Sequence, residues 1–261
     1  MTADVLLAVP FGIAIGLVVG AVGGGGAILA LPVLVYVLGE GVGAASTASL
    51  IVVAIAAGVG AGALALRGQV CWRLALIFSA PAAVGSVAGT VANGAVSARV
   101  LILAFVPVMA VAAAATWQRA GATNDDDTGV CPPVRTGRVI VAGGGVGTLT
   151  GFFGVGGGFL IVPVLTLWLG VGFRRSVATS LVIITLTGLS ALIGHLVADA
   201  SLDVPVTTAL AGSTGVGALL GTIGAQRVPQ AALGRAFAVL IVAIALYLLV
   251  DTLVLGGPPT G

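Results

Sequence analysis

Long apolar runs alternate with short polar connections along most of this 261-residue chain. Five of the runs are almost free of charge and about as long as a helix that crosses the hydrocarbon core of a bilayer. They cover Leu50 to Leu66, Leu74 to Ala92, Val100 to Trp117, Ser176 to Val197 and Ala231 to Leu255. The runs lack the alternation of apolar and polar positions that is typical of a transmembrane β-barrel. The pattern therefore predicts an all-α, polytopic transmembrane helix bundle.

Composition agrees with lipid as the main solvent. Apolar residues make up 59% of the chain, charged residues 7%, and the mean hydropathy is +1.26. A soluble globule needs more polar surface than this. The start of the chain has no basic region and no cleavage signature, so we expect its first apolar run to be an uncleaved membrane segment.

The chain contains an internal duplication. Residues 12–39 align with residues 143–170 at a constant offset of 131, with 12 identities in 28 positions. Gly85-x-x-x-Gly89 is repeated as Gly217-x-x-x-Gly221 at an offset of 132. The long polar stretch between the copies has the character of a solvated linker. We predict a first repeat over residues 1–118, a polar cytoplasmic linker over 119–137 and a second repeat over 138–261.

A glycine cluster interrupts the first apolar segment of each repeat. The segment from Val5 to Leu38 would be about 51 Å long as one helix, which is too long for a single straight crossing of the bilayer. If each broken segment turns back as a hairpin, nine of the ten arginines face the cytoplasm and Arg99 alone lies outside. If each crosses once, the arginines divide five and five. The positive-inside bias therefore predicts hairpins, each followed by three transmembrane helices, and hence two inverted repeats.

The glycine clusters are the leading candidates for a binding site. Consecutive glycines cost about 1 kcal/mol each relative to alanine in a helix, and non-helical backbone in a membrane needs a cavity or a protein environment. Free N–H groups after each break can hold an anion at the membrane midplane. The simpler alternative, close packing of helices through small residues, applies to Gly12-x-x-x-Gly16-x-x-x-Gly20 and its copy. The candidate residues are Gly23, Gly25, Gly26 and Ala27 in the first repeat and Gly154, Gly156, Gly157 and Gly158 in the second.

Other polar or helix-bending residues near the breaks carry weaker hypotheses. Pro32 and Pro163 lie inside the short return helices, where each bends the helix or frees a carbonyl group for a ligand. Ser49, Thr179 and Ser180 open the next helices, where helix capping competes with substrate binding. His195 and Glu40 are candidate proton-sensitive groups, although an interfacial residue without a role is the simpler interpretation.

The sequence offers little for other chemistry. Cys71 and Cys131 lack metal-ligand spacing and a secretory framework, so we expect free thiols. We expect no catalytic residues, no enzymatic activity, no metal and no cofactor, because nucleophile, nucleotide and metal motifs are lacking. We also expect no nucleic-acid partner, because the arginines form no stripe.

The paired motifs Gly23-x-Gly25-Gly26-x-x-Leu29-x-x-Pro32 and Gly154-x-Gly156-Gly157-Gly158-x-Leu160-x-x-Pro163 resemble those of the TauE/SafE family of sulfite exporters, also called toluene sulfonate uptake permeases. The resemblance implies transport of sulfite, thiosulfate, sulfoacetate or another organosulfonate across the cytoplasmic membrane. Val155 and Ala27 make the two clusters unequal, so the half-sites need not contribute equally. An anion channel of the same architecture and a non-transport membrane scaffold remain alternatives, and a homo-oligomer is possible.

Overall fold

The computed structural model describes residues 2–24, 26, 29–30, 33–37, 42–93, 96, 98–122, 131–153, 158–197 and 204–254, with the backbone alone at some helix ends. The regular elements of these residues are all helical, which confirms the all-α prediction. In chain order they are α1 (Thr2–Val22), the π-helical turn η1 (Val33–Val37), α3 (Val42–Ala65), α4 (Trp72–Asn93), α5 (Ala98–Ala122), α6 (Thr136–Phe153), α7 (Gly158–Leu167), α8 (Phe173–Val197), α9 (Val204–Ala225) and α10 (Gln230–Val254).

The five predicted spans coincide with α3, α4, α5, α8 and α10. Four windows in the described residues are long and apolar enough to cross a membrane, and they lie in α3, α4, α9 and α10. Large apolar side chains cover the outside of the bundle, as on α4, where Val84, Val87 and Val91 are all more than 60% exposed. Such a surface needs hydrocarbon around it, not water.

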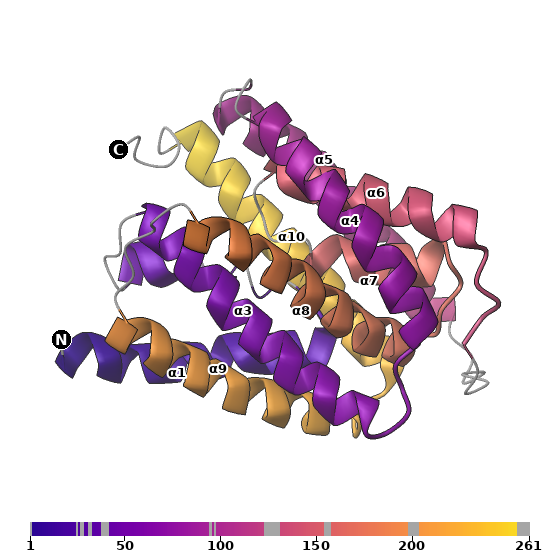
Figure 1. The fold of residues 1–261 in the computed structure, drawn as a ribbon, viewed down its shortest axis with the longest axis horizontal. Helices are drawn as coiled ribbons and strands as arrows, with labels where there is room; N and C mark the ends of the chain where they lie inside the picture. The colour runs from indigo at the N-terminus through magenta and orange to yellow at the C-terminus, as the bar shows by residue number, and fades with distance from the viewer. Residues whose placement is uncertain are drawn as a thin grey trace.

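Two pairs of helices approach each other at unusually short range. Helix α1 packs along α9, and α4 packs along α6 (Figure 1). A Cβ atom on Gly16 would strike the carbonyl oxygen of Thr214, and one on Gly147 would strike the carbonyl oxygen of Ala82. Only glycine permits this approach. The prediction that the glycine-x-x-x-glycine motifs serve helix packing is confirmed.

The centre of the bundle contains α3 and α8, which pack against each other. A large apolar core surrounds them and includes the fully buried rings of Phe78, Phe159 and Phe237. The ring of Phe159, at the start of α7, meets that of Phe105 edge to face at 5.2 Å. The short helix α7 is therefore fixed between α5 and α8.

Both glycine clusters coincide with helix ends. Helix α1 ends at Val22, and Gly23 follows with a φ of +72°, a left-handed conformation that favours glycine and commonly terminates helices. Helix α6 ends at Phe153, and α7 begins at Gly158. The predicted linker at 119–137 overlaps the last turn of α5, which continues to Ala122, and the first residues of α6.

Three connections meet through side-chain hydrogen bonds at one end of the bundle. The Arg174 guanidinium donates to the side-chain and main-chain oxygens of Gln226 and to the carbonyl of Val228. Gln226 also exchanges hydrogen bonds with Gln69. These contacts join the α3–α4 turn, the start of α8 and the α9–α10 turn. We call this the arginine-rich end, because it also carries Arg67, Arg73, Arg135, Arg138, Arg175, Arg227 and Arg235.

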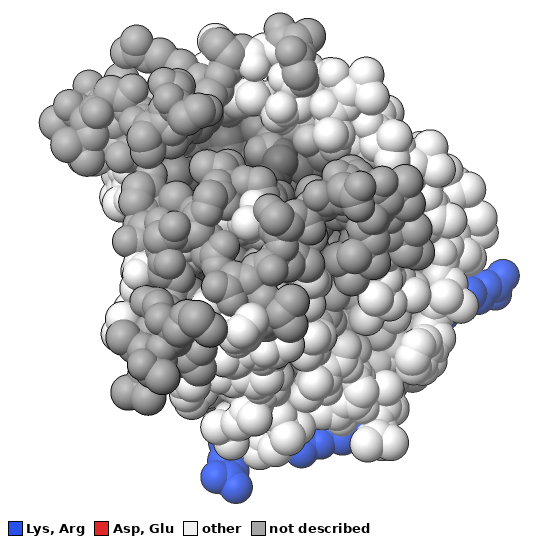
Figure 2. All heavy atoms as spheres, turned by 60° about the vertical axis from the view of Figure 1, so that its left-hand side comes forward, with Lys and Arg blue, Asp and Glu red and all other residues white. Residues whose placement is uncertain are grey.

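The surface view agrees with this segregation of charge. In Figure 2 the arginine side chains gather along the lower and right-hand margins, and the rest of the described surface on that face is uncharged. The described side chains include no carboxylate, and the Arg174 guanidinium donates there to carbonyl and amide oxygens.

The expectation of two free thiols is wrong. Cys71, just before α4, and Cys131, just before α6, form a disulfide with a Cα–Cα distance of 5.8 Å. The two residues are 60 positions apart, and the fold brings the segment before α6 against the start of α4. Sequence spacing carried no sign of that proximity.

Candidate functional site

The first glycine break is held by α8, a helix of the second repeat. The Ser180 hydroxyl, fully buried in α8, donates to the Gly23 carbonyl at 2.6 Å and also reaches the carbonyl of Val177 at 2.8 Å. The carbonyl of Gly23 is thereby satisfied where α1 has ended. Two predicted site residues from different repeats are thus in direct contact.

The two breaks lie against each other. A Cβ atom on Gly24 would strike the carbonyl oxygen of Gly158, the first residue of α7. A Cβ atom on Gly26 would fall on the side chain of Val19, with Val53 at 3.5 Å. The absence of a side chain at Gly24 allows the backbones of the two repeats to touch, whereas Gly26 packs against side chains of its own repeat.

A cavity of about 100 Å³ opens beside Gly158. This is room for a few water molecules or one small oxyanion, since a water molecule occupies about 30 Å³ of the liquid. Most of its wall is apolar, but three hydroxyl-bearing residues line it, one each from α4, α6 and α8. These are Ser86, Thr150 and Thr187.

Each of these hydroxyls donates a hydrogen bond to a carbonyl of its own helix. Ser86 donates to the Ala83 carbonyl at 2.8 Å, Thr150 to the Val146 carbonyl at 2.6 Å and Thr187 to the Ile183 carbonyl at 2.8 Å. A hydroxyl can rotate and exchange such a local bond for one to a ligand. The cavity can therefore present three donors without leaving any unsatisfied when it is empty.

The start of α7 adds a further source of positive potential. The first four N–H groups of a helix lack carbonyl partners within that helix, and here they begin at Gly158 on the cavity wall. Aligned peptide dipoles place about half a positive charge at this end. Together with the hydroxyls, the helix start makes this side of the cavity suited to an anion.

The three hydroxyls are not repeated at the equivalent positions of the first repeat. Under the duplication, Ser86, Thr150 and Thr187 correspond to Ala218, Val19 and Ala56, which are apolar and buried. Val19 occupies the space beside Gly26. At these three positions the hydroxyl groups therefore belong to the second break and not to the first.

Other predicted residues are placed apart from this cavity. Thr179 is fully buried in α8, but its Oγ1 accepts the Cys71 N–H at 3.2 Å, on the side of the disulfide. Ser49 is buried in α3 at the position equivalent to Ser180. Pro163 lies inside α7, as predicted, and lines a separate apolar groove between α5 and α7.

Several predicted positions lie outside the described residues. They are Gly25, Ala27, Pro32, Glu40, Gly154, Gly156 and Gly157. His195 lies in α8, and its side chain is not described.

Sequence reasoning missed Ser86, Thr150 and Thr187. A signal was present, because each neighbours a glycine, namely Gly85, Gly151 and Gly188. Gly85 and Gly151 lie at the close α4–α6 contact, so the adjacent hydroxyls are carried to the helix crossing that borders the cavity.

The fold and this cavity define a polytopic helical membrane protein with a small, mostly apolar cavity lined by three hydroxyl groups. Comparison with known proteins makes the class more specific. The family described as "Sulfite exporter TauE/SafE" matches residues 8–248, and the chain belongs to that family. It is a family of membrane transporters, as the resemblance of the glycine motifs predicted.

Two similar proteins come from Xylella fastidiosa, strains Temecula1 and 9a5c. Each is called "Probable membrane transporter protein" and is 30% identical over 242 residues, which cover 90% of this chain and 91% of the relative. No solved structure matches the chain.

Proposed function

We propose that this protein carries a small sulfur oxyanion, such as sulfite, thiosulfate or a small organosulfonate, across the cell membrane. The observation that supports this most directly is the cavity at Gly158, where three hydroxyls from α4, α6 and α8 meet the start of α7. Its volume suits an anion of this size, and its donors suit oxygen atoms.

The composition of the site favours transport over tight retention. The described lining contains no arginine, so the anion is held by dipoles and hydroxyl groups. A carrier must release its substrate, and binding through neutral donors is weak enough to permit release. A fixed arginine would hold the anion more strongly.

The packing supports two inverted repeats, 1–118 and 138–261, joined by the linker 119–137. The duplication pairs α1 with α6, α4 with α9, and the α4–α5 connection with the α9–α10 turn. The α9–α10 turn nevertheless contacts the α3–α4 turn, at the opposite end of α4, through Gln226 and Gln69. Oppositely oriented repeats account for this contact, whereas parallel repeats would separate the two turns.

Charge and energetics suggest orientation and direction. The arginine-rich end would face the cytoplasm, following the positive-inside bias. With a negative interior, expulsion of one anionic charge is favoured by about 2.3 kcal/mol per 100 mV, so export needs no coupling ion. We therefore favour uncoupled export.

Flux measured in proteoliposomes tests the proposal. Vesicles loaded with sulfite should release it when a membrane potential is imposed without a pH gradient. Release should saturate with concentration and show counterflow if the protein is a carrier. Unsaturable flux without counterflow would indicate the channel alternative, and absence of anion flux would contradict the proposed function.

A matched pair of variants tests the site itself. Thr187→Val removes a hydroxyl that lines the cavity. Thr185→Val is the control, because the Thr185 hydroxyl also donates to a carbonyl of its own helix, as that of Thr187 does, but does not line the cavity. One lost hydrogen bond of about 1 to 1.5 kcal/mol corresponds to a loss of sulfite affinity of about five- to twelvefold. Equal effects of the two substitutions would place the substrate elsewhere.

A further inference from the structure

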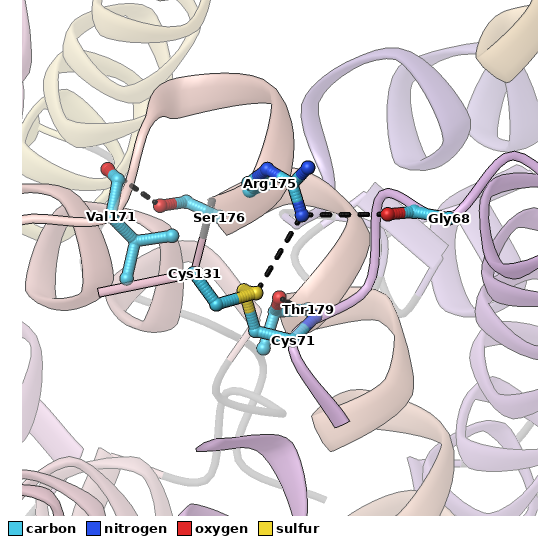
Figure 3. The surroundings of a disulfide bond; sticks show 7 residues. All are labelled: Gly68, Cys71, Cys131, Val171, Arg175, Ser176 and Thr179. Atoms are coloured by element: carbon cyan, nitrogen blue, oxygen red, sulfur yellow. Dashed lines mark hydrogen bonds between the residues drawn. A yellow bond between two sulfur atoms is a disulfide. The ribbon is translucent and has the colours of Figure 1, made fainter. Parts of the chain in front are cut away.

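The disulfide lies in a setting that promotes its cleavage. The Arg175 guanidinium donates to Cys131 Sγ at 3.6 Å and to the Gly68 carbonyl at 3.4 Å (Figure 3). Cys71 is 3% exposed, whereas Cys131 is only half-buried, so Cys131 is the more accessible residue of the pair. A cation beside this sulfur attracts anions to it.

The other sulfur is well placed to leave as a thiolate. Cys71 directly precedes α4, and its carbonyl accepts the Ala75 N–H at 2.9 Å, as expected of a helix-capping residue. Helix starts stabilise thiolates. Thiolate character in the leaving sulfur accelerates exchange at a disulfide.

We propose that the Cys71–Cys131 disulfide is a reaction site for anionic sulfur nucleophiles and that sulfite cleaves it reversibly. This rests on the proposed function for the identity of the nucleophile. It also fits the proposed cytoplasmic position of the arginine-rich end, where disulfides are rare and commonly transient or redox-sensing.

The reaction balances without an oxidant or a reductant. The lone pair of the sulfite sulfur forms a bond to Cys131 Sγ, and the bond between the two cysteine sulfurs breaks. Its electron pair remains on Cys71 as a thiolate, while Cys131 becomes an S-sulfonate that Arg175 can pair with. Attack of the Cys71 thiolate on Cys131 Sγ expels sulfite and restores the disulfide.

The disulfide is connected to the first glycine break by contiguous contacts. The Cys71 N–H donates to Thr179 Oγ1 at 3.2 Å, and the adjacent Ser180 holds the Gly23 carbonyl at 2.6 Å. A cleaved bridge would free the segment before α6 from the start of α4. Sulfite concentration would then act on the same helix that supports the first break.

Purified full-length protein in proteoliposomes, exposed to sulfite, tests this inference. We expect one free thiol to appear for each S-sulfonate found by peptide mass spectrometry on Cys131, and both to disappear when sulfite is removed. Sulfate, which lacks a nucleophilic sulfur lone pair, should give neither product. A lack of adduct, or an adduct on Cys71, would overturn the inference.

Charge variants test the part played by Arg175. Arg175→Gln should slow adduct formation about tenfold, because an anionic reagent loses its charge-assisted contact. Arg175→Lys should restore most of the rate. Arg227→Gln removes an equal charge from an exposed site at the same end and should leave the rate unchanged. Equal rates in Arg175→Gln and wild type would contradict the assigned role.

Failure of this inference and failure of transport are distinguishable. The double variant Cys71→Ser/Cys131→Ser cannot form the adduct, and its sulfite flux should persist without the modulation by sulfite that the wild type shows. Flux without adduct in the wild type overturns only the disulfide reaction. Adduct without flux overturns only the proposed transport.

Discussion

Ser180 ties the first glycine break to α8 through one fully buried hydroxyl. Ser180→Ala would leave the Gly23 carbonyl without this donor, at a cost of about 1 to 3 kcal/mol. We expect lower thermal stability in detergent together with reduced sulfite flux, because the break loses its anchor.

The matched control for this substitution is Ser190→Ala. Ser190 is exposed on the same helix and donates only to the Thr187 carbonyl of its own turn. If both variants lowered the melting temperature equally, the contact between Ser180 and Gly23 would contribute no more to stability than the local hydrogen bond of Ser190.

At Gly24 we expect destabilisation from an added side chain, whereas at Ser180 it follows from a lost hydroxyl. Gly24→Ala places a methyl group against the Gly158 carbonyl and should separate the two breaks, with a loss of about 1 to 3 kcal/mol and of most transport. Gly62→Ala in α3 meets no atom within 4 Å and should be neutral or stabilising by up to about 1 kcal/mol. Thermal unfolding of the two variants, measured side by side, checks this difference; tolerance of alanine at Gly24 would refute it.

Individual residues differed in how far the sequence could specify them. Ser180 was predicted to open a helix, but α8 begins at Phe173, so Ser180 lies inside α8 and does not cap it. Gly158 could be singled out because a glycine cluster is visible in one segment. Thr187 could not, because three consecutive turns of α8 carry hydroxyls and only packing decides which one faces the cavity. The pairing of Cys71 with Cys131 likewise depends on connections that are distant in sequence.

At the scale of elements, small residues decide which helices touch. A Cβ atom on Gly217 of α9 would strike the Ile13 carbonyl of α1, whereas one on Gly212 of the same helix meets nothing within 4 Å. Gly217→Ala should therefore weaken the α1–α9 contact by about 1 to 3 kcal/mol or more. Gly212→Ala should be neutral or slightly stabilising.

Thermal unfolding in micelles measures this contrast, and the equivalent substitution Gly85→Ala in α4 extends it to the second helix pair. Unchanged stability for both Gly217→Ala and Gly85→Ala would contradict the prediction that these close helix contacts require glycine.

Helix boundaries were the most predictable feature at this scale. Glycine clusters end α1 at Val22 and precede the start of α7 at Gly158, because glycine has low helix propensity and tolerates left-handed backbone. The sequence did not predict which helix packs against which. Small-residue motifs mark a helix as a close neighbour of another without saying which one, so the partner of α1 emerged only from the fold.

At the scale of the whole molecule, aromatic residues accompany the arginines. Trp72 at the start of α4, Trp117 near the end of α5 and Trp168 after α7 all lie toward the arginine-rich end and are each about half exposed. Arg235 stacks over the Trp117 ring at 5.9 Å. Tryptophan gathers at the interface between membrane and water. The arginine-rich end therefore has the chemistry of a membrane boundary, in keeping with the proposed topology.

The proposed opposite orientation of the two repeats predicts which connections share a side of the membrane. In a background with Cys71 and Cys131 replaced by serine, Leu66→Cys labels the α3–α4 turn, Val228→Cys the α9–α10 turn and Val96→Cys the segment between α4 and α5. A membrane-impermeant thiol reagent applied to right-side-out vesicles should modify Val96→Cys alone. Leu66→Cys and Val228→Cys should react only after the vesicles are opened, because their turns meet through Gln69 and Gln226 and would face the cytoplasm. Reaction of Leu66→Cys and Val228→Cys from opposite sides of the membrane would contradict inverted repeats. Reaction of both from outside would agree with inverted repeats but would place the arginine-rich end outside the cell.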